Sequence, residues 1–317
     1  MLNFIVQAIR IGMSFLLGST GETITEKSGH LNLGIPGIMC VGAASGCLTV
    51  SVYVDKVGVD AVNPVVLITL ALLASMLGGA VMGLIYAFLT ITLRANQNVT
   101  GLALTTLGTG IFGYIDPFIN AGNCTQTSKY FTNLFPFHEK LGWFGKLFFS
   151  YGIMVYLAIA IALVASFVLS RTRVGLNLRA VGENPATADA AGINVGRYKY
   201  VATLVGSSIA GLGGVCYIMD NLSGCWEYTV DAIGWLAIAL VIFTLWKPAL
   251  GIPGSIIFGA LYNACSYING VGFDYKALIK MLPYAVTVIV LVIVSMRKKR
   301  EHQPPAHLGL SYFREER

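Results

Sequence analysis

The sequence predicts an all-α membrane protein, a polytopic bundle of about 8–10 transmembrane helices. Of the 317 residues, 56% are hydrophobic and only 11% are charged, whereas about a quarter of the residues of an average soluble domain are charged. Apolar runs long enough to cross a hydrocarbon core of about 30 Å recur along nearly the whole chain. The membrane is therefore the solvent of the whole fold and not only of a single anchor.

Nine apolar runs are the expected membrane helices. They cover residues 3–20, 31–54, 64–93, 98–118, 150–170, 199–220, 234–246, 252–270 and 276–296. Gly and Pro interrupt the seventh and eighth runs, which fits broken or re-entrant segments as well as complete spans. We expect one transmembrane domain at residues 1–300, followed by a C-terminal tail at residues 301–317.

The distribution of Lys and Arg predicts the orientation, because basic loops are retained on the cytoplasmic side. Segment 171–199 is basic, and so is the run Arg297, Lys298, Lys299 and Arg300. Loops 55–63 and 221–233 are mainly acidic, and because successive helices cross the membrane in alternating directions, these loops fall on the outer side. We therefore expect a multi-pass protein of the cell (inner) membrane with its N-terminus outside and its C-terminus in the cytoplasm. The net charge of +6 is then explained by basic cytoplasmic loops that face acidic lipid, and no nucleic-acid partner is needed to account for it.

Catalytic and metal-binding motifs do not occur in the sequence. There is no P-loop, no H-E-x-x-H and no G-x-S-x-G, and the six cysteines form no C-x-x-C pair. No metal, cofactor or enzymatic activity is expected, so ATP hydrolysis would have to come from a separate subunit. Cys124 and Cys225 both fall on the expected outer face, where a disulfide between them is one option.

Two polar stretches interrupt the apolar pattern in the first third of the chain. Residues 21–37 read as a polar hairpin that leads into a helix with Pro36 near its start, a position where proline is tolerated. The second stretch contains three consecutive amides, Asn96, Gln97 and Asn98. Beside hydrocarbon, their hydrogen-bond donors and acceptors need partners. They either cap a helix junction or line the inner end of a solute path. The candidates for that path are Asn96, Gln97, Asn98, Thr105, Thr106 and Trp235.

The most informative stretch is 175–193. Asn184 is a good helix N-cap, Pro185 suits the first turn, and Gly192 suits the C-cap. This pattern predicts one short helix in a cytoplasmic loop. Small alanines and the acidic Glu183 and Asp189 would let it insert into a groove on a partner, although a solvated connecting helix fits the residues equally well.

These three stretches, in this order and together with Gly234–Ala239 and Trp246, resemble the permeases of the branched-chain amino acid and simple-sugar (ribose-type) ABC import family, most closely its nucleoside-importer branch. The likeness runs from about residue 15 to about residue 265. It implies a cytoplasmic ABC ATPase, a second and different permease subunit, and an extracytoplasmic solute-binding (lipo)protein. Pro36 departs from the branch, which more often carries an acidic residue there, and this affects the substrate assignment. The ATPase-coupling helix implied by the resemblance contains Gly182, Glu183, Asn184, Pro185, Asp189, Ala191 and Gly192.

The expected function is translocation of a small polar solute, a nucleoside first and a simple sugar next, driven by the partner ATPase. A stand-alone secondary carrier or channel is the main alternative, and it predicts uptake that depends on an ion gradient and not on ATP. A membrane enzyme or scaffold has no candidate catalytic group. Leu33–Gly37 recurs as Leu250–Gly254, which either reflects duplicated halves or arises by chance.

Overall fold

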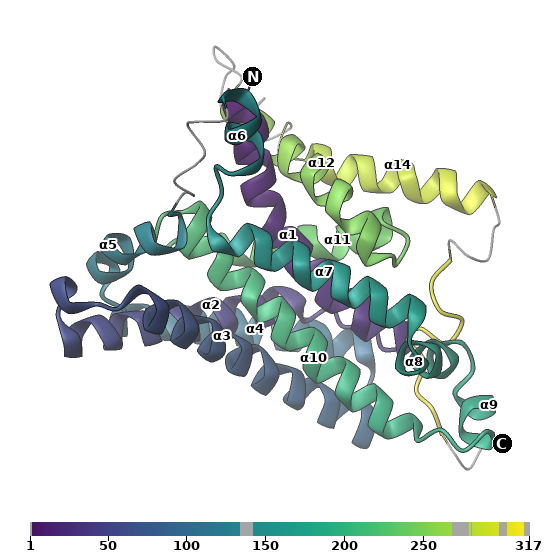
Figure 1. The fold of residues 1–317 in the computed structure, drawn as a ribbon. Helices are drawn as coiled ribbons and strands as arrows, with labels where there is room; N and C mark the ends of the chain where they lie inside the picture. The colour runs from purple at the N-terminus through teal and green to yellow at the C-terminus, as the bar shows by residue number, and fades with distance from the viewer. Residues whose placement is uncertain (1, 134–141, 268–278, 280, 298–302, 314–317) are drawn as a thin grey trace.

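The computed structural model describes residues 2–133, 142–267, 279, 281–297 and 303–313. Every regular element in these ranges is helical (Figure 1). The long helices are α1 (Leu2–Lys27), α2 (Ile35–Val57), α3 (Pro64–Ala87), α4 (Gln97–Ile115), α7 (Ile153–Arg171), α10 (Val195–Cys216), α11 (Val230–Phe243), α12 (Pro248–Tyr267) and α14 (Leu282–Arg297). The shorter elements are η1 (Val59–Ala61), η2 (Phe88–Thr92), η3 (Asp116–Phe118), α5 (Ala121–Phe131), α6 (Gly142–Phe148), α8 (Arg173–Glu183), α9 (Pro185–Ala190) and η4 (Tyr217–Asn221).

Each of the nine predicted runs overlaps one of the long helices, which confirms the all-α fold class. Five spans are long and apolar enough to cross a membrane, namely α1, α2, α3 with η2, α7, and α10 with η4. A sixth is counted if α4 with η3 and the following α5, which are bent by 105°, are one broken span. α11 has only 14 residues, fewer than the roughly 20 of a complete span. The broken or re-entrant option for the seventh run fits this helix.

The core of the bundle is built around α1 and α10. α1 packs against α10 and α12, while α10 also packs against α2 and α3 (Figure 1). Glycine permits close approaches between these helices; for example, a Cβ on Gly42 of α2 would lie 2.4 Å from the Cα of Gly211 in α10. Small residues at helix contacts are how membrane helices gain packing without a hydrophobic driving force between them.

α1 extends seven residues beyond the end of its predicted apolar run. Residues 21–27 continue the helix, and the turn into α2 occupies only 28–34. The buried carboxylates of this extension have partners: the Asn32 backbone N–H donates to Glu22 (2.9 Å), and the indole N–H of Trp246 donates to Glu26. Buried polar groups that are hydrogen-bonded in this way are tolerated inside the bundle.

Arg10 and Asp220 form an ion pair. Their side chains approach to 3.3 Å and join α1 to η4 across 210 residues of sequence. Asp220 is fully buried, so the guanidinium is the charge that makes its position tolerable.

The two copies of the Leu-Gly-Ile-Pro-Gly motif occupy different places in their helices. Pro36 lies in the first turn of α2, whereas Pro253 lies inside α12, which begins at Pro248. The first copy therefore opens its helix, whereas α12 begins two residues before the second copy starts.

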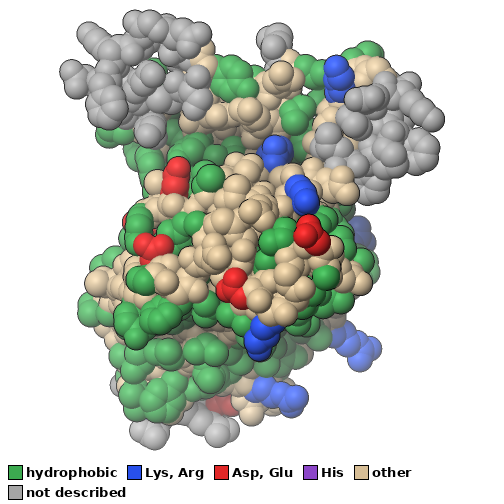
Figure 2. Space-filling view, turned by 90° about the vertical axis from the view of Figure 1, so that its left-hand side faces the viewer, with side chains coloured by type: hydrophobic (Ala, Val, Ile, Leu, Met, Phe, Trp, Pro, Cys, Tyr) green, Lys and Arg blue, Asp and Glu red, His purple; other side chains and the backbone are tan. Residues whose placement is uncertain are grey.

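The N-terminus and the described end of the tail lie at opposite ends of the molecule (Figure 1). α5 and α6 lie toward the N-terminal end, and α8, α9 and residues 303–313 lie at the other. Figure 2 faces the α5 end, where acidic and basic side chains sit on polar surface next to hydrophobic surface. The membrane side that each end faces stays a prediction from the Lys and Arg pattern, and Lys298–Arg300 lie outside the described residues.

Candidate functional site

The stretch predicted as one coupling helix forms two short helices that meet at Asn184. α8 ends at Glu183, and α9 runs over Pro185–Ala190. The Asn184 side chain accepts a hydrogen bond from the Thr187 backbone N–H (3.0 Å), and Pro185 is in the first turn. Gly192 has a φ of 84° just after the helix, as a glycine that ends a helix commonly does. The N-cap, the proline and the terminal glycine are as predicted, but Gly182 and Glu183 belong to the preceding helix.

α8 was not predicted from the sequence. Thr172 caps its start by accepting from the Gly175 N–H (3.2 Å), and its buried positions Leu178 and Val181 are three residues apart. Residues with this spacing lie on one face of a helix, so the apolar pattern of the sequence did indicate α8. Both residues pack into small hydrophobic clusters separate from the main core.

The α8–α9 corner, residues 173–192, touches the end of α1 directly. A Cβ on Gly182 would lie only 2.3 Å from the Lys27 carbonyl oxygen and 3.1 Å from the Gly29 nitrogen. Val181 and Ala188 pack with Val195 at the start of α10. The corner therefore contacts both α1 and α10, the two central helices of the bundle.

Residues 303–313, called here the C-terminal strap, cross the same corner. The His307 N–H donates to the Gly182 carbonyl (3.1 Å), and the Gly309 N–H donates to the Gly29 carbonyl (3.3 Å). The Tyr312 hydroxyl donates to Asp189 (3.0 Å). The strap was expected only as a tail. Its only sequence signal was the apolar and aromatic residues that follow Pro304 and Pro305.

The three amides predicted at the inner end of a solute path have different surroundings. Asn96 is the N-cap of α4 and accepts from the Val99 N–H (3.1 Å). Gln97 is buried, accepts from the Leu31 N–H (2.8 Å) and donates to the strap at the Leu310 carbonyl (3.3 Å). Asn98 is exposed. The first two are thus engaged in holding the helix junction, as the capping interpretation predicts.

The remaining candidates lie around the start of α2. The Thr105 hydroxyl of α4 donates to the Leu33 carbonyl (2.9 Å), while Thr106 bonds within its own helix. A Cβ on Gly234 of α11 would lie 2.4 Å from the Pro36 Cα, and Trp235 next to it is half-buried. The structure therefore places Thr105 and Gly234, the neighbour of Trp235, against the start of α2.

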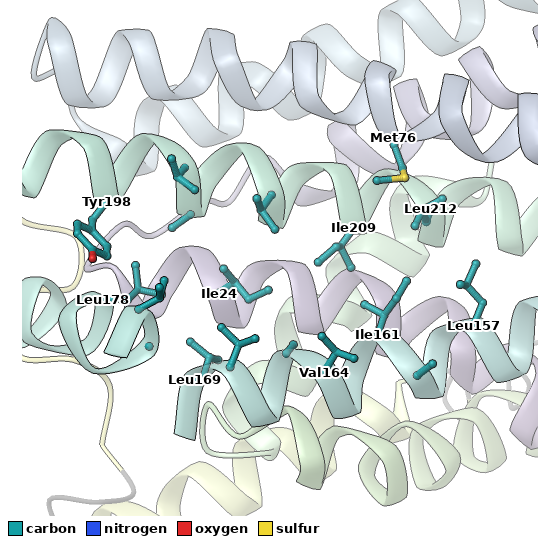
Figure 3. Close-up of a pocket in the computed structure, with 18 of the residues that line it drawn as sticks. Ile24, Met76, Leu157, Ile161, Val164, Leu169, Leu178, Tyr198, Ile209 and Leu212 are labelled. Atoms are coloured by element: carbon teal, nitrogen blue, oxygen red, sulfur yellow. The ribbon is translucent and has the colours of Figure 1, made fainter. Parts of the chain in front are cut away.

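A large cavity among the described residues is apolar and lies elsewhere. It has a volume of about 1170 Å³ and extends between α7 and α10, with α1 behind them (Figure 3). Its walls are aliphatic along most of their length, and Tyr198 lies toward one end. Such a lining suits hydrocarbon and not a polar solute.

The described cysteines are all free. Cys124 is buried and Cys225 is exposed, so the optional disulfide between them is not formed here, and the Cys124 thiol instead faces the Cys47 carbonyl (3.7 Å). The side chain of Cys265 lies outside what the structure describes. No group of three or more potential metal ligands occurs among the described residues.

Comparison with known proteins decides the family. The family described as branched-chain amino acid transport system / permease component matches residues 4–294. The chain belongs to this family. The permease is 32% identical over 286 residues to the guanosine ABC transporter permease protein NupQ of Bacillus subtilis, which covers 87% of this chain and 86% of the relative.

Two further relatives carry different substrates in their names. The nucleoside ABC transporter permease protein NupC of Lactococcus lactis is 31% identical over 284 residues, 87% of the permease and 86% of the relative. The putative glucose ABC transporter permease protein TsgC13 of Haloferax volcanii is 33% identical over 268 residues, 82% of the permease and 75% of the relative.

One solved structure shares the fold. It is an inward-facing conformation of a putative metal-chelate type ABC transporter, with a TM-score of 0.52 over 92% of the permease and 85% of that chain, at 11% identity. At this identity the likeness concerns the fold alone, which is that of a membrane-spanning ABC transporter permease.

Proposed function

We propose that this permease translocates nucleosides as one subunit of an ABC importer. The observation that carries the proposal is the likeness to NupQ and NupC, which are named for guanosine and for nucleosides and match over most of both chains. The likeness to a protein named for glucose makes a simple sugar the second candidate. In this assignment the permease binds no cofactor, and a separate cytoplasmic ATPase hydrolyses ATP.

The α8–α9 corner is the proposed contact with that ATPase. Its geometry supports this role, because Gly182 meets the end of α1 and Val181 meets α10. Closure of the ATPase would push α9, and the two central helices would follow. Alternating access needs only that the partner binds one conformation of the bundle better than the other.

The proposed solute path runs past the start of α2, between Thr105 and Trp235. An indole ring offers a face to a nucleobase, and hydroxyl groups suit the ribose. The remaining proposed partners are a second, different permease subunit and an extracytoplasmic solute-binding (lipo)protein that delivers the solute at the α5 end.

Reconstitution tests the proposal. The permease, its partner permease, the ATPase and the binding protein are placed in proteoliposomes, and uptake of labelled guanosine and glucose is measured with and without ATP. We expect ATP-dependent guanosine uptake that glucose does not inhibit. Glucose uptake alone would move the assignment to a sugar, and ATP-independent uptake driven by an ion gradient would favour the secondary carrier.

A further inference from the structure

A small cavity under the C-terminal strap gathers basic side chains. It has a volume of about 140 Å³ and lies where the turn 28–34, the junction of η2 with α4, the first turn of α10 and the strap meet. The residues that line it include His30, Thr90, Arg94, Gly196, Lys199 and Tyr312.

Lys199 is the least expected member of this group. It is only 2% exposed, and no ion pair joins it to a carboxylate among the described residues. The buried carboxylates of α1 are engaged elsewhere, Glu22 with the Asn32 N–H and Glu26 with Trp246. A buried ammonium is unfavourable unless an anion or strong acceptors compensate it.

His30 adds a further donor to this cavity. His30 is 2% exposed, and neither of its ring nitrogens has a hydrogen-bond partner. Burial, together with the charges of Lys199 and His307, lowers the pKa of His30 well below its usual range, and burial also lowers the pKa of His307. Both rings are therefore neutral near pH 7, and each presents one N–H donor.

The first turn of α10 supplies backbone donors. The helix begins at Val195, and its cap Asn194 accepts from the Arg197 N–H (3.0 Å). The other N–H groups of a first turn have no partner within the helix and attract anions. Gly196 lines the cavity, and Lys199, three residues later, projects from the same face of the helix.

We propose that this cavity binds one phosphate-sized oxyanion, held by the Lys199 ammonium, a His30 N–H and the first turn of α10. The cavity has the volume of about five water molecules at roughly 30 Å³ each. This volume accommodates a single phosphate group. A bound anion would join the turn 28–34, α10 and the strap through Tyr312, independently of the transported solute.

Thermal unfolding of the purified, full-length permease in detergent tests the site. Inorganic phosphate and chloride are titrated at equal ionic strength. We expect the melting temperature to rise with phosphate along a binding curve and not with chloride, because a ligand of the folded state stabilises it. Equal responses to the two anions would overturn the proposal.

Lys199→Met is the decisive variant, because its two effects have opposite signs. Without phosphate it should be at least as stable as the wild type, since an uncompensated buried charge is removed. With phosphate, the apparent affinity should fall at least tenfold. Lys247→Met, at an exposed lysine, is the matched control and should keep the wild-type response. Retention of that response by Lys199→Met would refute the site.

Two further arms identify the source of the anion. Inorganic phosphate is compared with a short-chain phosphatidic acid, and a response to the lipid alone would overturn a free anion in favour of a headgroup. Glu315 and Glu316 lie outside the described residues, so a double Glu→Gln variant is also titrated. A phosphate response that appears only in this variant would show that the chain's own carboxylates occupy the cavity, and would overturn the proposal.

Discussion

Replacing Gly182 by alanine is expected to separate the α8–α9 corner from α1. The added Cβ would lie 2.3 Å from the Lys27 carbonyl oxygen, about 1.1 Å short of the 3.4 Å at which ordinary contact begins. Both close neighbours, at Lys27 and Gly29, are backbone atoms and cannot rotate away. Overpacking of this kind costs about 1–3 kcal/mol, and the better helix propensity of alanine offsets up to about 1 kcal/mol. An approach as short as 2.3 Å belongs to the upper end of that cost, which leaves a net loss of about 2–3 kcal/mol for docking of the corner.

Two measurements detect this loss of stability. Thermal unfolding in detergent should show a lower melting temperature, and ATP-driven uptake in proteoliposomes should fall more than the amount of inserted protein. Gly196→Ala is the matched control, because its Cβ would meet only the Asn194 side-chain oxygen at 3.7 Å. Normal stability and normal uptake by Gly182→Ala would show that the close approach to α1 has no role in coupling.

Three further predictions concern charged and titratable groups. Glu183→Arg should abolish ATP-driven uptake while the protein still inserts. The control Glu227→Arg, at an exposed glutamate of the opposite end, should keep ATP-driven uptake. Equal uptake by the two variants would contradict the coupling role. Arg10→Ala should lower the free energy of unfolding by roughly 3–5 kcal/mol, because it leaves the buried Asp220 carboxylate without its partner. The double variant Arg10→Met with Asp220→Leu should recover most of this loss in denaturant unfolding. An unstable double variant would argue against charge as the cause. Because burial lowers the pKa of His30, stability should be complete above about pH 6.5 and fall as the pH decreases, by at most about 1.4 kcal/mol per pH unit. His30→Leu should flatten this slope in unfolding at pH 5–7, and an unchanged slope would assign it to other groups.

The positions of the long helices could be predicted because hydrocarbon imposes a strong constraint on sequence. Nine apolar runs became nine helices, with errors mainly at the ends. The extension of α1 through Glu22 and Glu26 could not be predicted from polarity, because its partners Asn32 and Trp246 come from elsewhere in the chain. The Arg10–Asp220 pair was missed for the same reason.

The local features of the candidate site could also be predicted, and the long-range ones could not. Asn184, Pro185 and Gly192 act through neighbours one to three residues away, so their roles follow from spacing alone. The strap contacts at Gly182, Gly29 and Asp189 join residues more than 100 positions apart. Nothing in the composition of the last residues indicates where they bind.

The strap also bears on how the protein is made. Residues 303–313 follow all of the described helices in the sequence, so the corner at Gly182 and Asp189 acquires its hydrogen bonds to the strap only after α1 to α14 have been synthesised. A chain truncated after α14 would keep these helices but present a corner that lacks the strap. Only chains that carry the strap would then offer the supported corner to partner subunits.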